Sequence, residues 1–160
     1  MCVVLFLRSA FWTVVAPGTV LAWVPLAALR TTGDRLNIGA GRWVGLPLIV
    51  LGACGLLWCI WEFGRAGRGT LSPADAPQFV VRGGLYRYVR NPMYVSVFTA
   101  LVGEIIFFRS PWLIVWAAVV ASWFFVVAIS EERRLGRQFG EPYEAYRRTV
   151  PRWLPRRPRV

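Results

Sequence analysis

Two clusters of polar residues lie next to apolar stretches of the sequence, and their residue types could do chemistry. The segment from Gly84 to Tyr94 is rich in Tyr and Arg and directly precedes an apolar run. The carboxylate pair Glu131 and Glu132 directly follows the next apolar run. If the two runs form a helical hairpin, both clusters meet at the same membrane surface. A small charged cofactor could be held there against a lipid-embedded substrate.

The composition is too apolar for an ordinary soluble domain. The chain has 160 residues, of which 56% are hydrophobic and nine are Trp, and its mean hydropathy is +0.48. A bilayer core of about 30 Å requires about 20 apolar residues in a helix. We therefore expect an all-α, integral-membrane domain over residues 1–160 with about four transmembrane helices. The expected spans are residues 10–29, 43–63, 93–108 and 111–130.

Proline residues predict where these spans are irregular. Pro25 and Pro47 lie inside apolar runs, as does the pair at residues 17–18, so we expect kinks there, which neighbouring helices can tolerate in lipid. Only residues 109–111, Arg-Ser-Pro, separate the third span from the fourth. The last two helices should therefore form an antiparallel hairpin.

The distribution of Arg predicts the orientation in the membrane. All nineteen basic residues are Arg; five lie between Arg65 and Arg90, and nine lie between Arg133 and Arg159. By the positive-inside bias both segments face the cytoplasm, and an even number of spans places the N-terminus there too. We treat residues 1–30 as a retained helix rather than a signal peptide because Arg8 lies inside the apolar stretch. The expected location is the cell membrane, with both termini cytoplasmic.

Charge and composition also exclude several functional classes. A net charge of +11 suggests nucleic acid in a soluble protein, but here the Arg clusters flank helix ends among Trp and Tyr. We therefore expect anionic lipid headgroups as partners and no nucleic acid. Cys2, Cys54 and Cys59 have no CxxC spacing, and the chain has no His. Disulfide frameworks, zinc sites and Ser-His-Asp catalysis are not indicated, and no metal is expected.

Both polar clusters also have a simple structural interpretation. Asn91 is a favoured helix N-cap and Pro92 a favoured first-turn residue, so the first cluster could merely begin the third helix with an interfacial belt of Tyr. The carboxylate pair could be a solvated helix end, and Leu135, Phe139, Tyr143 and Tyr146 could lie on one amphipathic surface helix. The chain would then be a non-catalytic membrane protein whose Arg-rich tail binds lipid or a partner.

The order and spacing of the motifs point further. Four segments carry a joint pattern: residues 84–94, 131–135, 139–146 and 150–155. Together they resemble the isoprenylcysteine carboxyl methyltransferase and phospholipid methyltransferase family of integral-membrane enzymes, over roughly residues 78–155. The resemblance implies methyl transfer from S-adenosylmethionine, held between the hairpin and a C-terminal lid. The cofactor contacts that it implies are Gln78, Phe79, Val80, Val81, Tyr86, Asn91, Pro92, Met93, Tyr94 and Glu131.

The residue types suit this cofactor, which carries an ammonium, a carboxylate, a sulfonium and an adenine. Glu131 could bind the ammonium, and Arg90 or the first N–H groups of the third span could bind the carboxylate. Tyr86 or Tyr94 could face the sulfonium or line the adenine. An anionic acceptor needs no protein base, whereas a protonated amine would need a carboxylate such as Glu132. Glu132 and Arg90 are therefore the candidate catalytic residues.

Two departures from the family bear on the substrate. Members that act on prenylated cysteine usually have His where this chain has Asn91, and Arg where it has Val127. The second departure removes a cation that could hold a carboxylate, which argues against prenylcysteine. We expect a small lipid, an isoprenoid-derived acid or another lipophilic molecule that enters from the bilayer.

Some questions stay open at this stage. Isoprenoid and sterol reductases resemble the same family around an Arg-X-Pro-X-Tyr motif and bind a nicotinamide cofactor, although they generally have more spans. We expect Glu104 either to pair with Arg109 or to be exposed at a helix end. Glu62, near the cytoplasmic end of the second span, could be interfacial or could reach the pocket.

Overall fold

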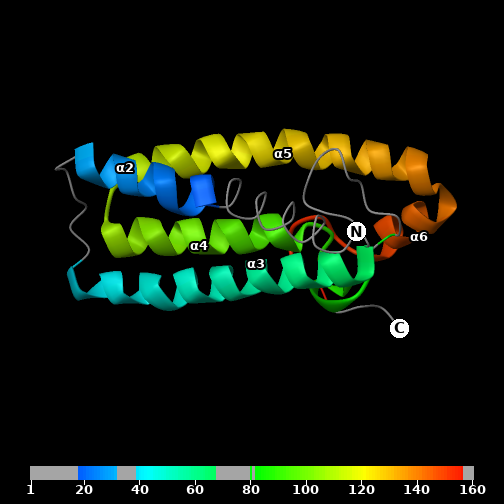
Figure 1. Ribbon diagram of the computed structural model, residues 1–160, viewed down its shortest axis with the longest axis horizontal. Coiled ribbons are helices and arrows are strands. Elements are labelled where there is room, and N and C mark those ends of the chain that lie inside the picture. Colours follow the sequence, from blue (N-terminus) through cyan, green and yellow to red (C-terminus); the bar gives the residue numbers. More distant parts are fainter. Residues whose placement is uncertain (1–17, 32–38, 68–79, 81, 157–160) are drawn as a thin grey trace, which may run out of the picture.

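The computed structural model describes residues 18–31, 39–67, 80 and 82–156. Every regular element among them is helical, which confirms the expected all-α class. The elements are η1 (Thr19–Trp23), α2 (Val24–Thr31), η2 (Gly39–Val44), α3 (Gly45–Gly67), η3 (Gly84–Arg87), α4 (Pro92–Phe108), α5 (Pro111–Phe139) and α6 (Glu141–Thr149). Figure 1 shows α3, α4 and α5 as three long rods with α4 in the middle. We call the two ends of this bundle the α6 end and the hairpin end.

Two helices of the bundle are long and apolar enough to cross a membrane. They are the segment Gly39–Glu62 and the helix Pro111–Phe139, while the apolar helix Pro92–Phe108 is shorter. Only 22% and 17% of the two apolar windows are buried in the bundle, whereas a core helix of a soluble protein would be mostly buried. Large apolar side chains such as Trp123 are instead exposed on the outer surface, where lipid would solvate them.

Helix α4 packs closely against α3 through glycines. A Cβ atom added to Gly103 would lie 2.7 Å from the carbonyl oxygen of Gly45. Farther along, a Cβ atom on Gly52 would lie 2.5 Å from the amide nitrogen of Ala100. Small residues allow such close backbone contact, which is a common basis of helix association in lipid. This contact fixes α4, and with it the polar residues at its N-terminus, relative to α3.

The expected hairpin between α4 and α5 is present. Arg109 ends α4 in the left-handed conformation with φ 61°, and its amide donates to the carbonyl of Ile105 at 2.9 Å. Ser110 follows in extended conformation, and Pro111 begins α5. The two helices then run antiparallel, so the start of α4 and the far end of α5 both lie at the α6 end (Figure 1).

Two proline expectations had different outcomes. Around Pro25 the helix is irregular, because a π-helix precedes it and the amide of Val24 donates to Thr19. In the same pattern the N–H of residue 25 would donate to the carbonyl of Val20, but proline has no N–H. Nε1 of Trp116 donates to this carbonyl instead, at 3.0 Å. The kink expected at Pro47 stays a prediction. Pro47 lies in the first turn of α3, directly after the change from the 3-10 helix η2 to α-helix.

The helix of the fourth expected span continues beyond that span. Helix α5 runs through the carboxylate pair to Phe139, because Glu, Arg, Leu and Gln are good helix formers. It ends at Gly140, whose φ of 59° favours glycine, and α6 begins directly afterwards. The single surface helix expected over residues 135–146 is therefore two helices. The four apolar residues of that expected helix, Leu135, Phe139, Tyr143 and Tyr146, still pack together. They form one cluster with Val80 and Val150.

Candidate functional site

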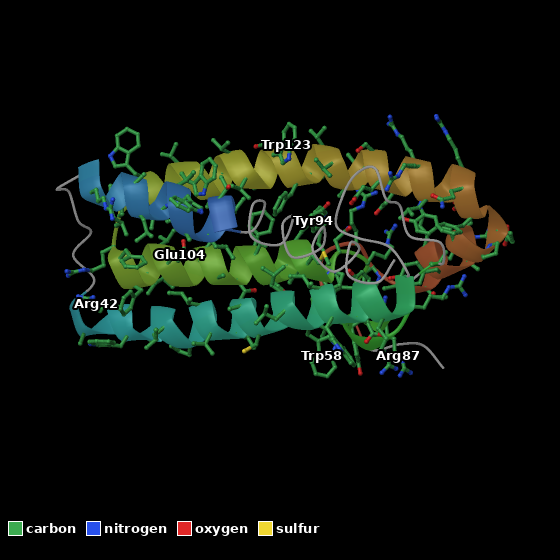
Figure 2. The ribbon with its side chains drawn as sticks, viewed as in Figure 1. Arg42, Trp58, Arg87, Tyr94, Glu104 and Trp123 are labelled. Atoms are coloured by element: carbon green, nitrogen blue, oxygen red, sulfur yellow. The ribbon has the colours of Figure 1, made fainter. Side chains whose placement is uncertain are left out.

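The two motifs meet in a hydrogen bond between α4 and α5. The phenol oxygen Oη of Tyr94 donates to Oε2 of Glu131 at 2.7 Å. Figure 2 shows Tyr94 in the space between the two helices. Its ring stacks on Phe124, with centroids 4.4 Å apart, and lies 6.4 Å from the ring of Trp153. Glu131 is thus a partly buried carboxylate at the α6 end, beside several aromatic rings.

Tyr86 approaches the same place from the loop before α4. Its backbone carbonyl accepts a hydrogen bond from the phenol of Tyr146 on α6 at 2.7 Å. Burial raises the pKa of the Tyr86 phenol well above its ordinary value, and the neighbouring Cys59, Tyr146, Glu131 and Tyr94 raise it further. The Tyr86 phenol therefore remains neutral, and it lies within electrostatic range of the Tyr94–Glu131 pair.

Glu132 is enclosed by two arginines. Arg152 donates two hydrogen bonds to it, from Nε to Oε1 at 2.8 Å and from Nη2 to Oε2 at 2.7 Å. Nη1 of Arg90 lies 3.0 Å from Oε1, and only 8% of the Glu132 side chain is exposed. The hydrogen bonds to Glu132 raise the pKa of Arg152. We call these three residues the Glu132 clamp; they form a buried, charge-assisted network rather than a free carboxylate.

The C-terminal segment lies across the loop before α4. The amide of Arg90 donates to the carbonyl of Pro151 at 2.8 Å, and the amide of Arg156 donates to Tyr88 at 3.0 Å. Asn91 occupies the N-cap position, as expected, but its side chain makes no capping bond. Its Nδ2 donates instead to the carbonyl of Arg152 at 3.3 Å. Residues 150–156 therefore form a lid that is fixed to the loop on both sides of Trp153.

Arg90 keeps donor capacity in this arrangement. Its Nε and Nη1 atoms are buried and donate no hydrogen bond to the described residues. Nη1 forms an ion pair with Glu132 but does not have the geometry of a hydrogen bond to it. Buried donors of this kind are costly unless a partner satisfies them. The carboxylate of the cofactor, which we expect to bind Arg90 or the first N–H groups of the third span, would be such a partner.

The remaining predicted site residues are dispersed. Val80 packs against Tyr143 and Tyr146 beneath α6, and Met93 packs against the core of the bundle. Pro92 is buried in the first turn of α4. The predicted contacts at residues 78, 79 and 81 lie outside the described residues.

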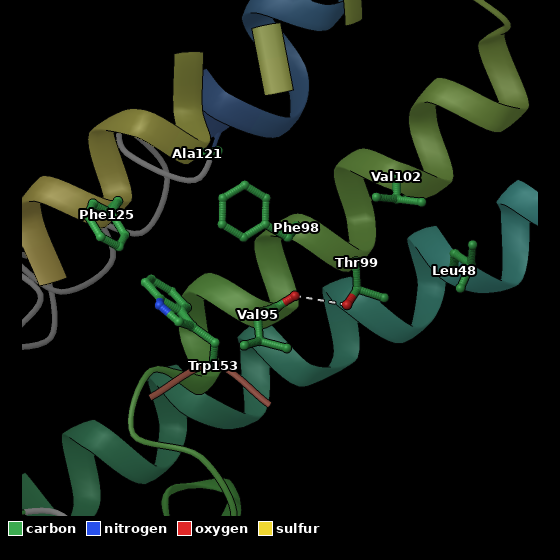
Figure 3. Close-up of a pocket in the computed structure, with 8 residues that line it drawn as sticks. All are labelled: Leu48, Val95, Phe98, Thr99, Val102, Ala121, Phe125 and Trp153. Atoms are coloured by element: carbon green, nitrogen blue, oxygen red, sulfur yellow. Dashed lines mark hydrogen bonds between the residues drawn. The ribbon is translucent and has the colours of Figure 1, made fainter. Parts of the chain in front are cut away.

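An apolar groove adjoins the site and was not foreseen from the sequence. It has a volume of about 560 Å³. Figure 3 shows the side chains that line it, which are Leu48, Val95, Phe98, Thr99, Val102, Ala121, Phe125 and Trp153. The hydroxyl of Thr99 donates to the carbonyl of Val95 at 2.8 Å, so the lining is apolar apart from the indole N–H of Trp153. The groove runs along α4 from the lid toward the middle of the bundle.

Glu104 lies far from this site, and both expectations for it were wrong. Its side chain is buried, with 5% exposed, rather than exposed at a helix end. Within the described part of the chain it forms no ion pair with Arg109, and its Oε2 has no hydrogen-bond partner.

The fold and site are those of a small helical membrane enzyme with a polar cluster beside an apolar groove. A family model for phospholipid methyltransferases matches residues 40–142, more than half of the chain. The chain therefore belongs to the phospholipid methyltransferase family and is an integral-membrane, S-adenosylmethionine-dependent methyltransferase. This confirms the resemblance and favours the methyltransferase over the reductase and the non-catalytic alternative. None of the curated proteins shows significant sequence similarity to the chain.

The residues at the α6 end fit the chemistry of this cofactor. Glu131 offers a carboxylate of the kind that binds an ammonium, and the buried donors of Arg90 are of the kind that binds a carboxylate. The ring of Tyr94 and the buried phenol of Tyr86 supply aromatic surface for a sulfonium or an adenine. The match ends at residue 142, so the lid residues Arg152 and Trp153 lie beyond it.

Proposed function

We propose that the protein transfers a methyl group from S-adenosylmethionine to the headgroup of a membrane phospholipid whose hydrocarbon chain lies in the apolar groove. The observation that carries this proposal is the position of Trp153. Its ring lies 6.4 Å from that of Tyr94 and also lines the groove. A lipid whose chain lies in the groove would therefore present its headgroup beside the Tyr94–Glu131 pair. The family name supports a phospholipid as the acceptor.

The cofactor is held by residues from both motifs. Glu131, oriented by Tyr94, binds the ammonium, and Arg90 with the first N–H groups of α4 binds the carboxylate. Tyr86 and Tyr94 line the adenine and the sulfonium. When bound, the cofactor supplies an electrophilic methyl group on sulfur. Asn91 fixes the lid over this site through its hydrogen bond to the carbonyl of Arg152.

Alignment is the main contribution of the protein to the reaction. The nucleophilic headgroup atom must lie in line with the methyl group, and correct orientation of two reactants can lower a barrier by about 7–11 kcal/mol. The groove restrains one reactant and the polar cluster restrains the other. The exclusion of water by Phe124, Trp153 and the lid strengthens the electrostatic contacts at the site.

In this proposal Glu132 positions the lid and does not move a proton. Both of its oxygens accept hydrogen bonds from Arg152, and Arg90 lies beside them, so a proton on Glu132 would disrupt the clamp. A protonated amine headgroup would instead lose its proton to water at the membrane surface before it approaches the cofactor. This revises the proton-accepting role expected for Glu132 from the sequence. Arg90 retains a binding role through its remaining donors.

The proposed orientation places the α6 end at the cytoplasmic surface. Exposed arginines gather there on α5 and α6, including Arg133, Arg137 and Arg148. Such residues interact favourably with anionic lipid headgroups, which are most abundant on the cytoplasmic leaflet. With α4 and the first apolar segment also inserted, the chain has four spans and two cytoplasmic termini.

A transfer assay tests the proposal. The purified full-length chain is reconstituted into vesicles of defined phospholipids and supplied with S-adenosylmethionine that carries a labelled methyl group. We expect label in the phospholipid fraction, and less than a tenth of it with Glu131→Gln. Trp123→Phe, on the exposed face of α5, serves as the control and should retain wild-type transfer. Cofactor binding without label in any phospholipid would refute the proposed acceptor.

A further inference from the structure

The loop before α4 leaves the carbonyl of Tyr86 without the donors that a continued helix would give it. In a helix this carbonyl would accept from the amide of residue 89 or of residue 90. The amide of Val89 donates instead to the carbonyl of Leu85 at 3.3 Å. The amide of Arg90 donates to the carbonyl of Pro151 on the lid at 2.8 Å. The carbonyl of Tyr86 therefore needs another donor.

The phenol of Tyr146 on α6 takes the place of these amides. Its Oη donates to the carbonyl of Tyr86 at 2.7 Å, across 60 positions of the sequence. Tyr146 is buried, with 8% exposed, and burial raises the pKa of its phenol above the ordinary value, so the donor proton is retained at neutral pH. On the other side of the residue, the amide of Tyr86 donates to the carbonyl of Gly83 at 3.0 Å. Both backbone groups of Tyr86 are thus held.

Helix α6 is itself fixed relative to the loop and to α5. It begins directly after Gly140, at the end of the helix that carries Glu131, and turns back from that end (Figure 1). The guanidinium of Arg82 in the loop donates to a carbonyl in the first turn of α6. Tyr146 therefore ties the loop that carries Tyr86 to the helix that carries Glu131.

We propose that Tyr146 is a positioning residue for the cofactor site: its hydrogen bond to the carbonyl of Tyr86 sets the place of the Tyr86 ring relative to Glu131. This inference rests on the proposed function, because it assumes that Tyr86 and Glu131 contact the cofactor. Tyr146 lies beyond residue 142, where the family match ends. The proposal assigns to α6 a part in cofactor affinity although its side chain binds no part of the cofactor.

Cofactor binding to Tyr146→Phe tests the hydrogen bond, because this change retains the buried ring and removes only the donor. The dissociation constant of S-adenosylhomocysteine is measured by calorimetry on the full-length, detergent-purified protein. We expect binding about fivefold weaker than that of the wild type, as for the loss of one hydrogen bond. Tyr88→Phe, at a partly exposed ring of the same loop, is the matched control and should bind as the wild type does. The KM for the phospholipid should stay unchanged, because none of the residues that line the groove lies on α6.

A double-mutant cycle shows whether Tyr146 acts through Tyr86. Tyr86→Leu removes the aromatic contact and should weaken binding about tenfold. If Tyr146 only positions that ring, Tyr146→Phe adds little in this background, and the double variant binds about tenfold rather than about fiftyfold more weakly than the wild type. Independent effects that multiply to about fiftyfold would overturn the positioning role.

Thermal unfolding of the ligand-free protein separates positioning from stability. A Tyr146→Phe variant that unfolds at a lower temperature but binds S-adenosylhomocysteine as the wild type does would overturn the proposal, because the hydrogen bond would then serve stability alone. Failure of the wild type itself to bind this ligand would overturn the proposed function and, with it, this inference. Wild-type binding beside an unaffected Tyr146→Phe variant would overturn this inference alone.

Discussion

Oη of Tyr94 and Oε2 of Glu131 lie 2.7 Å apart in a hydrogen bond between residues that are 37 positions apart in the sequence. This bond joins the motif before α4 to the carboxylate pair near the end of α5. It orients a carboxylate that would otherwise rotate freely at the helix surface. The proposed ammonium site depends on this orientation.

The first prediction concerns this hydrogen bond. Tyr94→Phe retains the aromatic ring that stacks on Phe124 but removes the donor to Glu131. A hydrogen bond to a charged group contributes about 1.5–3 kcal/mol, so the affinity for S-adenosylmethionine should fall by about tenfold or more. Calorimetric titration measures the change. Tyr88→Phe, at a partly exposed ring of the same loop, is the control and should bind as the wild type does.

The second prediction concerns the Glu132 clamp. Glu132→Ala leaves Arg90 and Arg152 as unpaired cations, of which Arg90 is 12% exposed. Breaking a buried ion pair by removing one partner costs about 3–5 kcal/mol, and we expect a loss at the lower end because Arg152 is partly exposed. Denaturant unfolding in detergent measures the free energy of unfolding. A loss below about 0.5 kcal/mol, typical of a surface pair, would show that the clamp is not a stabilising element.

The third prediction concerns the contact between α3 and α4. Gly103→Ala places a methyl group 2.7 Å from backbone atoms of α3, which cannot move aside without separating the helices. Overpacking of this kind costs about 1–3 kcal/mol. Gly136→Ala is a matched control, since its methyl group would meet only the flexible carboxylate of Glu144 at 3.3 Å. The unfolding midpoints of the two variants should differ clearly, and equal midpoints would contradict the close packing.

The fourth prediction concerns the apolar groove. Val102→Trp fills the end of the groove that is farthest from the lid. From Val95 to Val102 the helix rises about 10 Å, so the blocked groove should favour acceptors with shorter chains. We expect a severalfold rise in KM for long-chain phospholipids with unchanged cofactor affinity. Val119→Trp, on the exposed face of α5, should leave both quantities unchanged.

The fifth prediction concerns the orientation of the bundle. Single cysteines are introduced as Arg148→Cys at the α6 end and Ala40→Cys at the hairpin end, after replacement of the native cysteines; both positions are exposed. A membrane-impermeant thiol reagent applied to intact cells should label Ala40→Cys and spare Arg148→Cys. The reverse pattern would invert the proposed topology, and the cofactor site would then face away from the cytoplasm.

Hydropathy and turn chemistry were sufficient to predict much of the fold. Long apolar runs identify α3 and α5 because lipid requires them, and residues 109–111 identify the hairpin because Pro111 must begin a new helix. The end of α5 could not be predicted in this way. The last turns of α5 are charged, and charged residues form a helix in water as readily as in the bundle. Hydropathy therefore does not mark the residue at which this helix ends.

The site was predictable in part. The order of the two motifs around a hairpin brings Tyr94 and Glu131 together, and the structure has them in a hydrogen bond. The partner of Glu132 could not be predicted, because nine arginines follow span four and only the path of the lid selects Arg152. Trp153 lacks a local signal for the same reason. Its neighbours come from distant parts of the chain, and spacing along one helix does not encode them.

The central claim is that Glu131 binds S-adenosylmethionine at the α6 end. Calorimetric titration of the full-length, detergent-purified protein with S-adenosylmethionine and S-adenosylhomocysteine, beside Glu131→Ala, tests it most directly. We predict saturable binding of both ligands to the wild type. For Glu131→Ala we predict affinities weaker by at least about tenfold, as expected for loss of a charge-assisted contact. Binding of the same strength to a folded Glu131→Ala variant would contradict the account.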